Sequence, residues 1–237
     1  MGGNPGPQFA PDRAKRVPSL NWYLLSLATA ALVTLNLFGL GADSLNFDHQ
    51  KPGKPPAGWT LTATGASQQA SRWDVLQDAT APSRPNVLEQ RSTNFSENEF
   101  ALAVFDKTTC RDADLSVKFK IAAGPRRIKS AGMVWRYQDP RNYYLLRFSV
   151  DEGNIALFRV QDGQMHAIPG AVRHDFQTDQ WYVAKVSFRG SRFRILFGNR
   201  QLFDATDNAL TAPGKTGLWT RAGTEASFDD FRLEKKG

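Results

Sequence analysis

Arginine and aromatic residues recur on short apolar segments in the middle of the chain. Residues 131–160, AGMVWRYQDPRNYYLLRFSVDEGNIALFRV, read as three strands joined by two short polar turns. Side chains two residues apart on a strand share a face, so we expect Arg136 beside Val134 and Arg147 beside Tyr143. If the strands are neighbours, these side chains line one face of a sheet. The residues of this candidate binding surface are Arg136, Tyr143, Arg147, Arg159, Trp219 and Arg221.

Guanidinium groups beside aromatic rings favour two kinds of ligand. Sugars stack on rings and accept hydrogen bonds, and the carboxylates of a partner protein form bidentate pairs with arginine. A structural role is the alternative, in which each arginine pairs with a loop aspartate such as Asp139, Asp151 or Asp162 and stabilises the sheet. The sequence alone leaves both interpretations open.

The acidic residues do not form the pattern that glycoside hydrolysis requires. A retaining hydrolase needs two carboxyl groups about 5 Å apart. Glu97 and Glu99 alternate, but Ser-Glu-Asn-Glu is typical of an exposed loop. The histidines His49, His166 and His174 are each isolated in or beside a turn. We therefore predict no catalytic residue and expect that this protein is not an enzyme.

Charge and cysteine content narrow the classes of partner. The net charge of +7 is spread over many loops, which suits an acidic partner or an anionic membrane surface, whereas nucleic acid would need a denser basic stripe. Two basic turns, 126–129 and 189–194, are typical of solvated hairpin ends, with lipid phosphates or an acidic subunit as alternative contacts. Cys110 is the only cysteine, so an internal disulfide is excluded.

Short strands separated by turn residues account for the chain from residue 59 onward. Residues 114–121 alternate between apolar and polar types, which marks a strand with one buried face. The predicted strands are 59–64, 72–76, 87–90, 100–105, 114–121, 133–137, 143–150, 155–160, 165–168, 181–189, 192–197, 201–205, 217–220 and 226–233, with 44–48 as a further candidate. The predicted fold class is all-β, a two-sheet antiparallel sandwich.

A series of short motifs occurs in a fixed order over residues 44–237. The motifs are Phe47-Asp48, Gly58-Trp59, Ala131-Gly132-Met133-Val134-Trp135-Arg136, Asn142-Tyr143-Tyr144, Trp181 with Lys185-Val186, Gly217-Leu218-Trp219 and Phe228-Asp229-Asp230-Phe231. Their order resembles the concanavalin A-like lectin/glucanase superfamily, which includes laminin-G-like domains. The resemblance implies a jelly-roll sandwich. Within the superfamily, the chain is similar to bacterial 3-keto-disaccharide hydrolase-like domains, which tend to carry a glutamate on the strand after the Gly-x-x-x-Arg element. Here that strand, 143–148, has no acid, which implies a non-catalytic member.

The same resemblance implies a candidate structural calcium site. Sandwiches of this superfamily often hold an ion on the convex face between the first and last strands, with aspartate and backbone oxygens as ligands. Asp48 and Asp230 are the candidates in this sequence. No other cofactor is expected.

A long uncharged stretch precedes the predicted sandwich. Residues 22–42, WYLLSLATAALVTLNLFGLGA, would span about 32 Å as a helix, close to the roughly 30 Å of a bilayer core. Arg13, Lys15 and Arg16 precede it, so the positive-inside rule places the N-terminus in the cytoplasm. The residues expected to anchor the helix in lipid are Trp22, Tyr23, Leu24, Leu32 and Phe38. A cleaved signal peptide ending at the small residues 39–42 is the alternative.

These features predict a polar cytoplasmic leader (1–21), a transmembrane anchor (22–42), a Pro/Gly/Lys-rich tether (43–57) and a sandwich (58–237). The expected function is a non-catalytic interaction module on the periplasmic side of a bacterial inner membrane. It would bind glycan or serve as an accessory subunit of a membrane protein complex. The alternatives are a hydrolase of 3-keto- or ordinary glycosides and, after cleavage, a secreted lectin.

Overall fold

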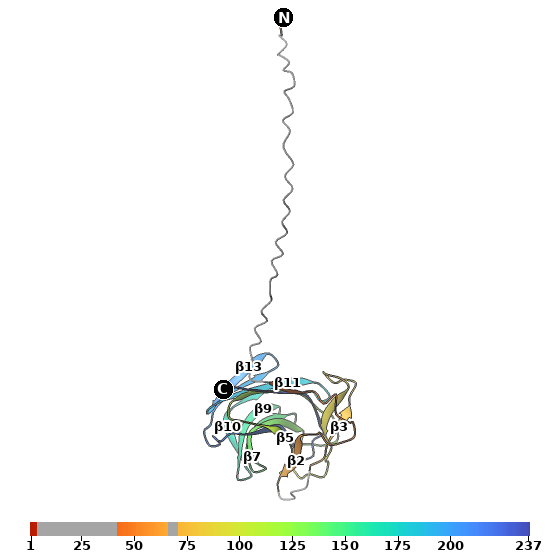
Figure 1. Ribbon diagram of the computed structural model, residues 1–237, viewed down its shortest axis with the longest axis vertical. Coiled ribbons are helices and arrows are strands. Elements are labelled where there is room, and N and C mark those ends of the chain that lie inside the picture. Colours follow the sequence, from red (N-terminus) through yellow and green to blue (C-terminus); the bar gives the residue numbers. More distant parts are fainter. Residues whose placement is uncertain (4–41, 66–70) are drawn as a thin grey trace, which may run out of the picture. The chain divides into compact units, whose positions relative to one another are not determined.

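Two layers of β-structure form the described part of the protein. The structure is a computed structural model in which residues 1–3, 42–65 and 71–237 are described. Across these ranges, fifteen strands form two antiparallel sheets, and no residue is helical. Figure 1 shows the sheets as stacked layers, with β11 and β13 in one and β2, β5, β7 and β9 in the other. The predicted all-β sandwich is confirmed.

The eight-stranded sheet has the order β13-β12-β11-β6-β15-β4-β3, and β1 also pairs with β15. Its strands are β1 (Ala42–Leu45), β3 (Trp73–Gln77), β4 (Asn86–Gln90), β6 (Ala113–Ile121), β11 (Tyr182–Arg189), β12 (Arg192–Phe197), β13 (Arg200–Thr206) and β15 (Ala226–Lys235). Strands far apart in the sequence, such as β6 and β15, are therefore neighbours.

The seven-stranded sheet has the order β10-β9-β8-β7-β14-β5-β2. Its strands are β2 (Trp59–Thr64), β5 (Phe100–Cys110), β7 (Ser130–Asp139), β8 (Asn142–Ser149), β9 (Asn154–Gln161), β10 (Gln164–Arg173) and β14 (Gly214–Arg221). The three strands of the predicted meander, β7, β8 and β9, lie side by side in this sheet. The strands that carry Arg136, Arg147 and Arg159 are therefore neighbours, as a shared arginine face requires.

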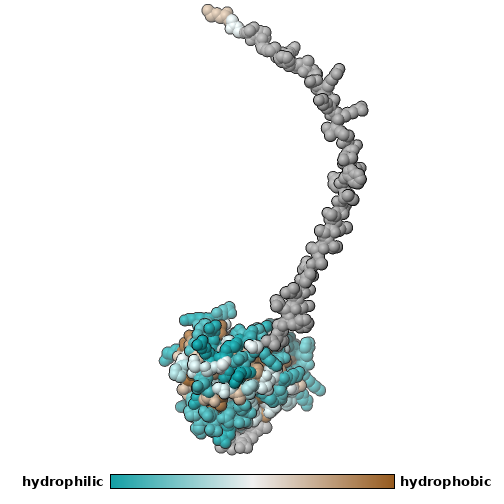
Figure 2. All heavy atoms as spheres, turned by 60° about the vertical axis from the view of Figure 1, so that its left-hand side comes forward, coloured by the Kyte–Doolittle hydropathy of each residue, from teal (hydrophilic) through white to brown (hydrophobic). Residues whose placement is uncertain are grey.

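Alternating side chains build the core between the sheets. In β6, Leu115, Val117 and Phe119 are buried, while the intervening residues are partly exposed. Phe119 stacks on Phe148 of the opposite sheet, with ring centroids 4.2 Å apart. Burying one such ring stabilises the fold by about 1.5–3 kcal/mol. Figure 2 shows the complementary result, a surface that is mainly hydrophilic on the face in view.

The segment that precedes residue 58 belongs to the sandwich. β1 begins at Ala42 and pairs with β15, and Phe47 is buried in the core. The side-chain amide of Asn86 donates to the carbonyl oxygens of Phe47, Asp48 and Gln50. The candidate strand at 44–48 overlaps β1, so the start of the predicted tether 43–57 pairs with the sandwich. Its prolines and glycines mark turns within the domain, which composition alone did not distinguish from a linker.

The predicted membrane anchor lies almost entirely outside the described residues. Its core, 22–41, lies outside them, and its last predicted residue, Ala42, is the first residue of β1. No helix within the described ranges is long and apolar enough to cross a bilayer. The predicted anchor residues Trp22, Tyr23, Leu24, Leu32 and Phe38 all fall outside the described ranges.

Candidate functional site

The seven-stranded sheet is so strongly curled that its edge strand β2 contacts β8 of the same sheet. The contact lies on the outer face of the sheet, which is the face turned away from the other sheet. The Oγ1 of Thr64, near the end of β2, lies 2.9 Å from the hydroxyl oxygen of Tyr143 on β8, and Thr64 also donates to the carbonyl oxygen of Pro140. Three strands separate β2 from β8 in the sheet order, which would place them about 19 Å apart in a flat sheet. Strand twist and curl remove that separation.

An apolar cluster on this outer face forms a second core, which we call the outer cluster. Its buried residues are Phe100, Leu102, Val104, Val134, Tyr143, Leu145, Val160 and Trp219. Tyr143 and Trp219 have no exposed surface, and burial raises the pKa of Tyr143 above its usual range. These two predicted binding residues therefore pack the sheet and present no surface to a ligand.

Two of the predicted arginines meet at one end of the outer cluster. Arg147 donates from Nη1 to Oε1 of Glu152 at 2.7 Å and from Nη2 to Oε2. Arg221 approaches the same carboxylate, with 3.7 Å between Nη1 and Oε1, and its Nε donates to the carbonyl oxygen of Glu97 at 2.8 Å. We call Arg147, Glu152, Asn154 and Arg221 the arginine cluster.

The half-buried ring of Phe158 borders the arginine cluster. The Arg147 guanidinium lies 4.8 Å from the centroid of the Phe158 ring, and Asn154 accepts a hydrogen bond from Arg147 at 3.0 Å. Phe158 and Met165 lie at the rim of the outer cluster and are half-buried. Polar groups that fix one another thus lie next to the partly exposed ring of Phe158.

Arg136 lies on the opposite side from the one predicted. β7 changes register between Trp135 and Asp139, and Arg136 has φ +48°. Such a bulge shifts the alternation of side chains. The guanidinium is buried between the sheets, where it donates to the carbonyl oxygens of Arg111 at 3.2 Å, Leu210 at 3.0 Å and Gly190. The expected face shared with Val134 is therefore corrected, and Arg136 fixes three loops.

Arg159 also points away from Arg147. It pairs with Asp207, with 2.5 Å between Nη1 and Oδ2, and the hydroxyl of Tyr144 donates to the other oxygen of Asp207 at 2.6 Å. The Tyr144 hydroxyl is protonated at neutral pH, and burial raises its pKa further, to about 12. Arg159 therefore has the structural role that was the alternative to ligand binding, in which an arginine pairs with an aspartate and stabilises the sheet. Its partner is Asp207, which follows β13, and not one of the three loop aspartates suggested by the sequence.

The sequence did not indicate Glu152, Asn154 or Phe158. Glu152 and Asn154 lie in or next to the turn between β8 and β9, where polar residues are expected for turn formation alone. Phe158 lies opposite Leu145 in the register, on the face of Arg147. The turn at 151–154 fixes which residues of β8 and β9 lie opposite each other, and this register would have placed Phe158 on the face of Arg147. Register decides the face because a shift of one residue moves every side chain to the other face of the sheet.

Comparisons with known proteins identify the fold. No protein-family model matches the sequence, and the search of curated proteins finds no match. Among solved structures, the carbohydrate-binding module CBM66 from Bacillus subtilis is 20% identical, with a TM-score of 0.57 over 74% of this chain and 94% of that chain. The exoplasmic/lumenal domain of VIP36 in its Ca²⁺/Man-bound form is 10% identical, with a TM-score of 0.55 over 82% and 89%. A β-glucanase from Bacillus licheniformis is 13% identical, with a TM-score of 0.52 over 83% and 99%. The chain has a concanavalin A-like fold.

The predicted calcium ligands of this concanavalin A-like sandwich are engaged elsewhere. Oδ1 of Asp48 accepts the backbone N–H of Asn86 at 3.0 Å, and Asp230 pairs with the Lys118 ammonium at 2.7 Å. An ammonium beside a carboxylate opposes the binding of a second cation. Within the described ranges, no group of three or more His, Cys, Asp or Glu side chains is arranged to hold a metal ion. Asp48 and Asp230 as they lie therefore do not fit a calcium site.

Proposed function

We propose that this protein is a glycan-binding module that does not hydrolyse its ligand. The observation that carries the proposal is the arginine cluster, in which Arg147 and Arg221 share the Glu152 carboxylate next to the half-buried ring of Phe158. Side chains of both signs are held in place before a ligand arrives, so little conformational freedom is lost on binding.

Each part of the cluster matches one property of a sugar. Arg221 has 21% and Glu152 39% of its side chain exposed, which leaves a donor and an acceptor accessible to hydroxyl groups. Phe158 provides apolar surface for the C–H face of a pyranose ring. The shared fold with a carbohydrate-binding module and with a Man-bound lumenal domain supports the same class of ligand.

Hydrolysis is the alternative, and the contacts of Glu152 speak against it. A general acid needs a carboxyl group with a proton to donate. Both oxygens of Glu152 instead accept hydrogen bonds from Arg147. The β-glucanase among the similar structures shows that the fold is compatible with hydrolysis, but a fold alone does not determine an activity.

Glycan binding is tested with the full chain in mild detergent on an array of neutral and acidic glycans. We expect Arg221→Ala to weaken binding to the recognised glycan at least tenfold, because the variant removes one donor and leaves the Arg147–Glu152 pair intact. Arg91→Ala, an exposed arginine paired with Glu89 on the other sheet, is the matched control. Equal binding by the Arg221→Ala variant would contradict the proposal, and so would turnover of a 3-keto-glycoside that the substitution abolishes.

We further propose that residues 22–41 hold the module at a bacterial inner membrane, with the sandwich on the periplasmic side, as an accessory subunit of a membrane protein complex. The uncharged composition of the segment and the basic residues before it support this arrangement. Intact-mass measurement of the native protein tests retention of the segment. A mature N-terminus beyond residue 41, or a protein that elutes from native membranes without any associated chain, would contradict it.

A further inference from the structure

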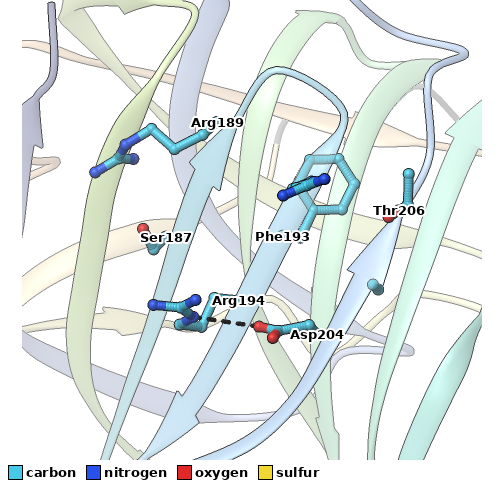
Figure 3. Close-up of a pocket in the computed structure, with 8 residues that line it drawn as sticks. Ser187, Arg189, Phe193, Arg194, Asp204 and Thr206 are labelled. Atoms are coloured by element: carbon cyan, nitrogen blue, oxygen red, sulfur yellow. Dashed lines mark hydrogen bonds and ion pairs between the residues drawn. The ribbon is translucent and has the colours of Figure 1, made fainter.

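The outer face of the eight-stranded sheet carries a second feature, which the proposed function does not use. Strands β11, β12 and β13 form a depression of about 650 Å³ at the end of this sheet. Its polar side chains are Ser187, Arg189, Arg192, Arg194, Asp204 and Thr206. Figure 3 shows Arg194 and Asp204 side by side across β12 and β13, with Arg189 and Ser187 on β11. We call these six residues the basic groove.

Like charges face each other in this groove. Arg189 lies directly opposite Arg192 in the register of β11 and β12, and like charges that face each other directly destabilise a sheet. Arg189 is neutralised by Asp114, with 2.7 Å between Nη2 and Oδ1. Among the described residues, no hydrogen bond or ion pair engages the guanidinium of Arg192. The groove therefore holds an uncompensated cation that an anionic group would neutralise.

The turn that presents these arginines is held from both sides. The backbone N–H of Gly190 donates to Asp112 at 2.8 Å, and the carbonyl oxygen of Gly190 accepts from the buried Arg136. Arg136 has 1% of its side chain exposed and is fixed by two further carbonyl groups. The backbone positions of Arg189 and Arg192 are thus set by the fold, so that a ligand need order only their side chains.

We propose that the basic groove binds an acidic polysaccharide through the carboxylates of its uronic acid residues. Arg192 and Arg194 supply bidentate donors for a carboxylate. Ser187, Thr206 and Asp204 supply the donors and the acceptor that sugar hydroxyls need. A lipid surface fits less well, because its phosphates present few hydroxyl groups to Ser187, Asp204 and Thr206. The groove lies on a different sheet from the arginine cluster, so this site does not depend on the function proposed above.

The test is affinity electrophoresis of the full chain in mild detergent against polygalacturonate, with dextran as the neutral glycan. We expect retardation by polygalacturonate, a fall in affinity of at least tenfold in Arg192→Gln/Arg194→Gln, and weakening by added salt. Arg173→Gln, an exposed arginine at the end of β10 on the other sheet, is the single-charge control and should bind within twofold of wild type.

Three results would overturn the inference. The first is an equal loss in Arg173→Gln, which would show that net charge alone is responsible. The second is stronger competition by glycerol phosphate than by galacturonate, which would assign the groove to phosphate. The third is unchanged binding in the double variant. The thermal midpoint of each variant checks folding, and Arg192→Lys, which keeps the charge, should retain part of the affinity if the fold is intact.

Discussion

Arg147 and Arg221 lie on different strands of the seven-stranded sheet and meet at one carboxylate, that of Glu152. The Arg147 side chain is 5% exposed, whereas Glu152 is 39% exposed. The buried cation therefore depends on an anion that remains accessible from solvent. This asymmetry explains how the same carboxylate can stabilise the fold and still offer an acceptor to a ligand.

Neutralising that carboxylate is expected to destabilise the fold. Glu152→Gln leaves Arg147 buried with a weaker partner, and we expect a loss of about 1–2 kcal/mol, below the 3–5 kcal/mol of a fully buried pair because Glu152 is solvent-accessible. Urea denaturation measures the change. Glu234→Gln removes a partner of Lys236 at the protein surface and should change the free energy of unfolding far less than Glu152→Gln does. Equal effects of the two substitutions would contradict the structural role of Glu152.

Arg136 is expected to matter for stability more than any other predicted binding residue. Arg136→Ala leaves the carbonyl groups of Arg111, Leu210 and Gly190 without their donor, at a cost of about 3 kcal/mol or more. Arg136→Lys keeps the charge but cannot span three acceptors, so its loss should fall between those of wild type and Arg136→Ala. Chemical denaturation distinguishes the three proteins, and a loss below 1 kcal/mol in Arg136→Ala would contradict the assignment.

Sequence patterns predicted the strands well because alternation and turn residues act locally. The predicted segment 192–197 coincides with β12, and 114–121 differs from β6 by one residue. The arginine face was predicted only in part, because the bulge at Arg136 is a local irregularity that a strict two-residue period does not contain. Arg147 and Arg221 do come together, but their common partner, Glu152, lies in a turn whose polar residues carried no separate signal.

The burial of Tyr143 and Trp219 was beyond prediction for a different reason. It results from the approach of Thr64 to Tyr143 across three intervening strands. Curl accumulates over a whole sheet and depends on strand order, which no local pattern specifies. Aromatic residues on an outer face therefore looked like ligand contacts, although here they form a second core.

Gly132 makes room for the outer cluster. A Cβ at this position would lie 2.6 Å from the carbonyl oxygen of Leu146 and 3.4 Å from Cε3 of Trp219. We expect Gly132→Ala to destabilise the protein by about 3 kcal/mol, as overpacking of a rigid sheet does. Gly124→Ala is the control, because nothing lies within 4 Å of its Cβ and its φ is not positive. The shift in thermal midpoint of the first variant should exceed that of the second several-fold, and similar shifts would contradict this account.

Cys110 is expected to be unreactive in the folded protein. Its thiol is buried at the end of β5, and burial raises its pKa to about 11. At pH 8 the reactive thiolate is then roughly two orders of magnitude rarer than in an unfolded chain with a pKa near 8.5. Labelling with a disulfide reagent should be at least 100-fold slower in buffer than in denaturant. Rapid labelling of the native protein would show that the end of β5 opens.

Asp114 should make stability depend on pH in the acid range. Burial alone would raise its pKa, but hydrogen bonds from Ser187, Lys185 and Arg189 outweigh burial and hold the pKa at about 2, below the ordinary value of 3.8. A carboxyl group with a lowered folded-state pKa stabilises the protein above the unfolded-state value, and this contribution is lost as the pH falls from about 4 to 2. It amounts to about 2 kcal/mol at neutral pH.

Asp114→Asn should therefore be less stable than wild type by about this amount at pH 7 and equally stable near pH 2, measured by urea denaturation at both values. Burial raises the pKa of Asp229, which acts in the opposite direction, but its contribution is common to both proteins and cancels in the comparison. A difference in stability that is the same at pH 7 and pH 2 would show that the ionised carboxylate of Asp114 does not hold β6 to β11.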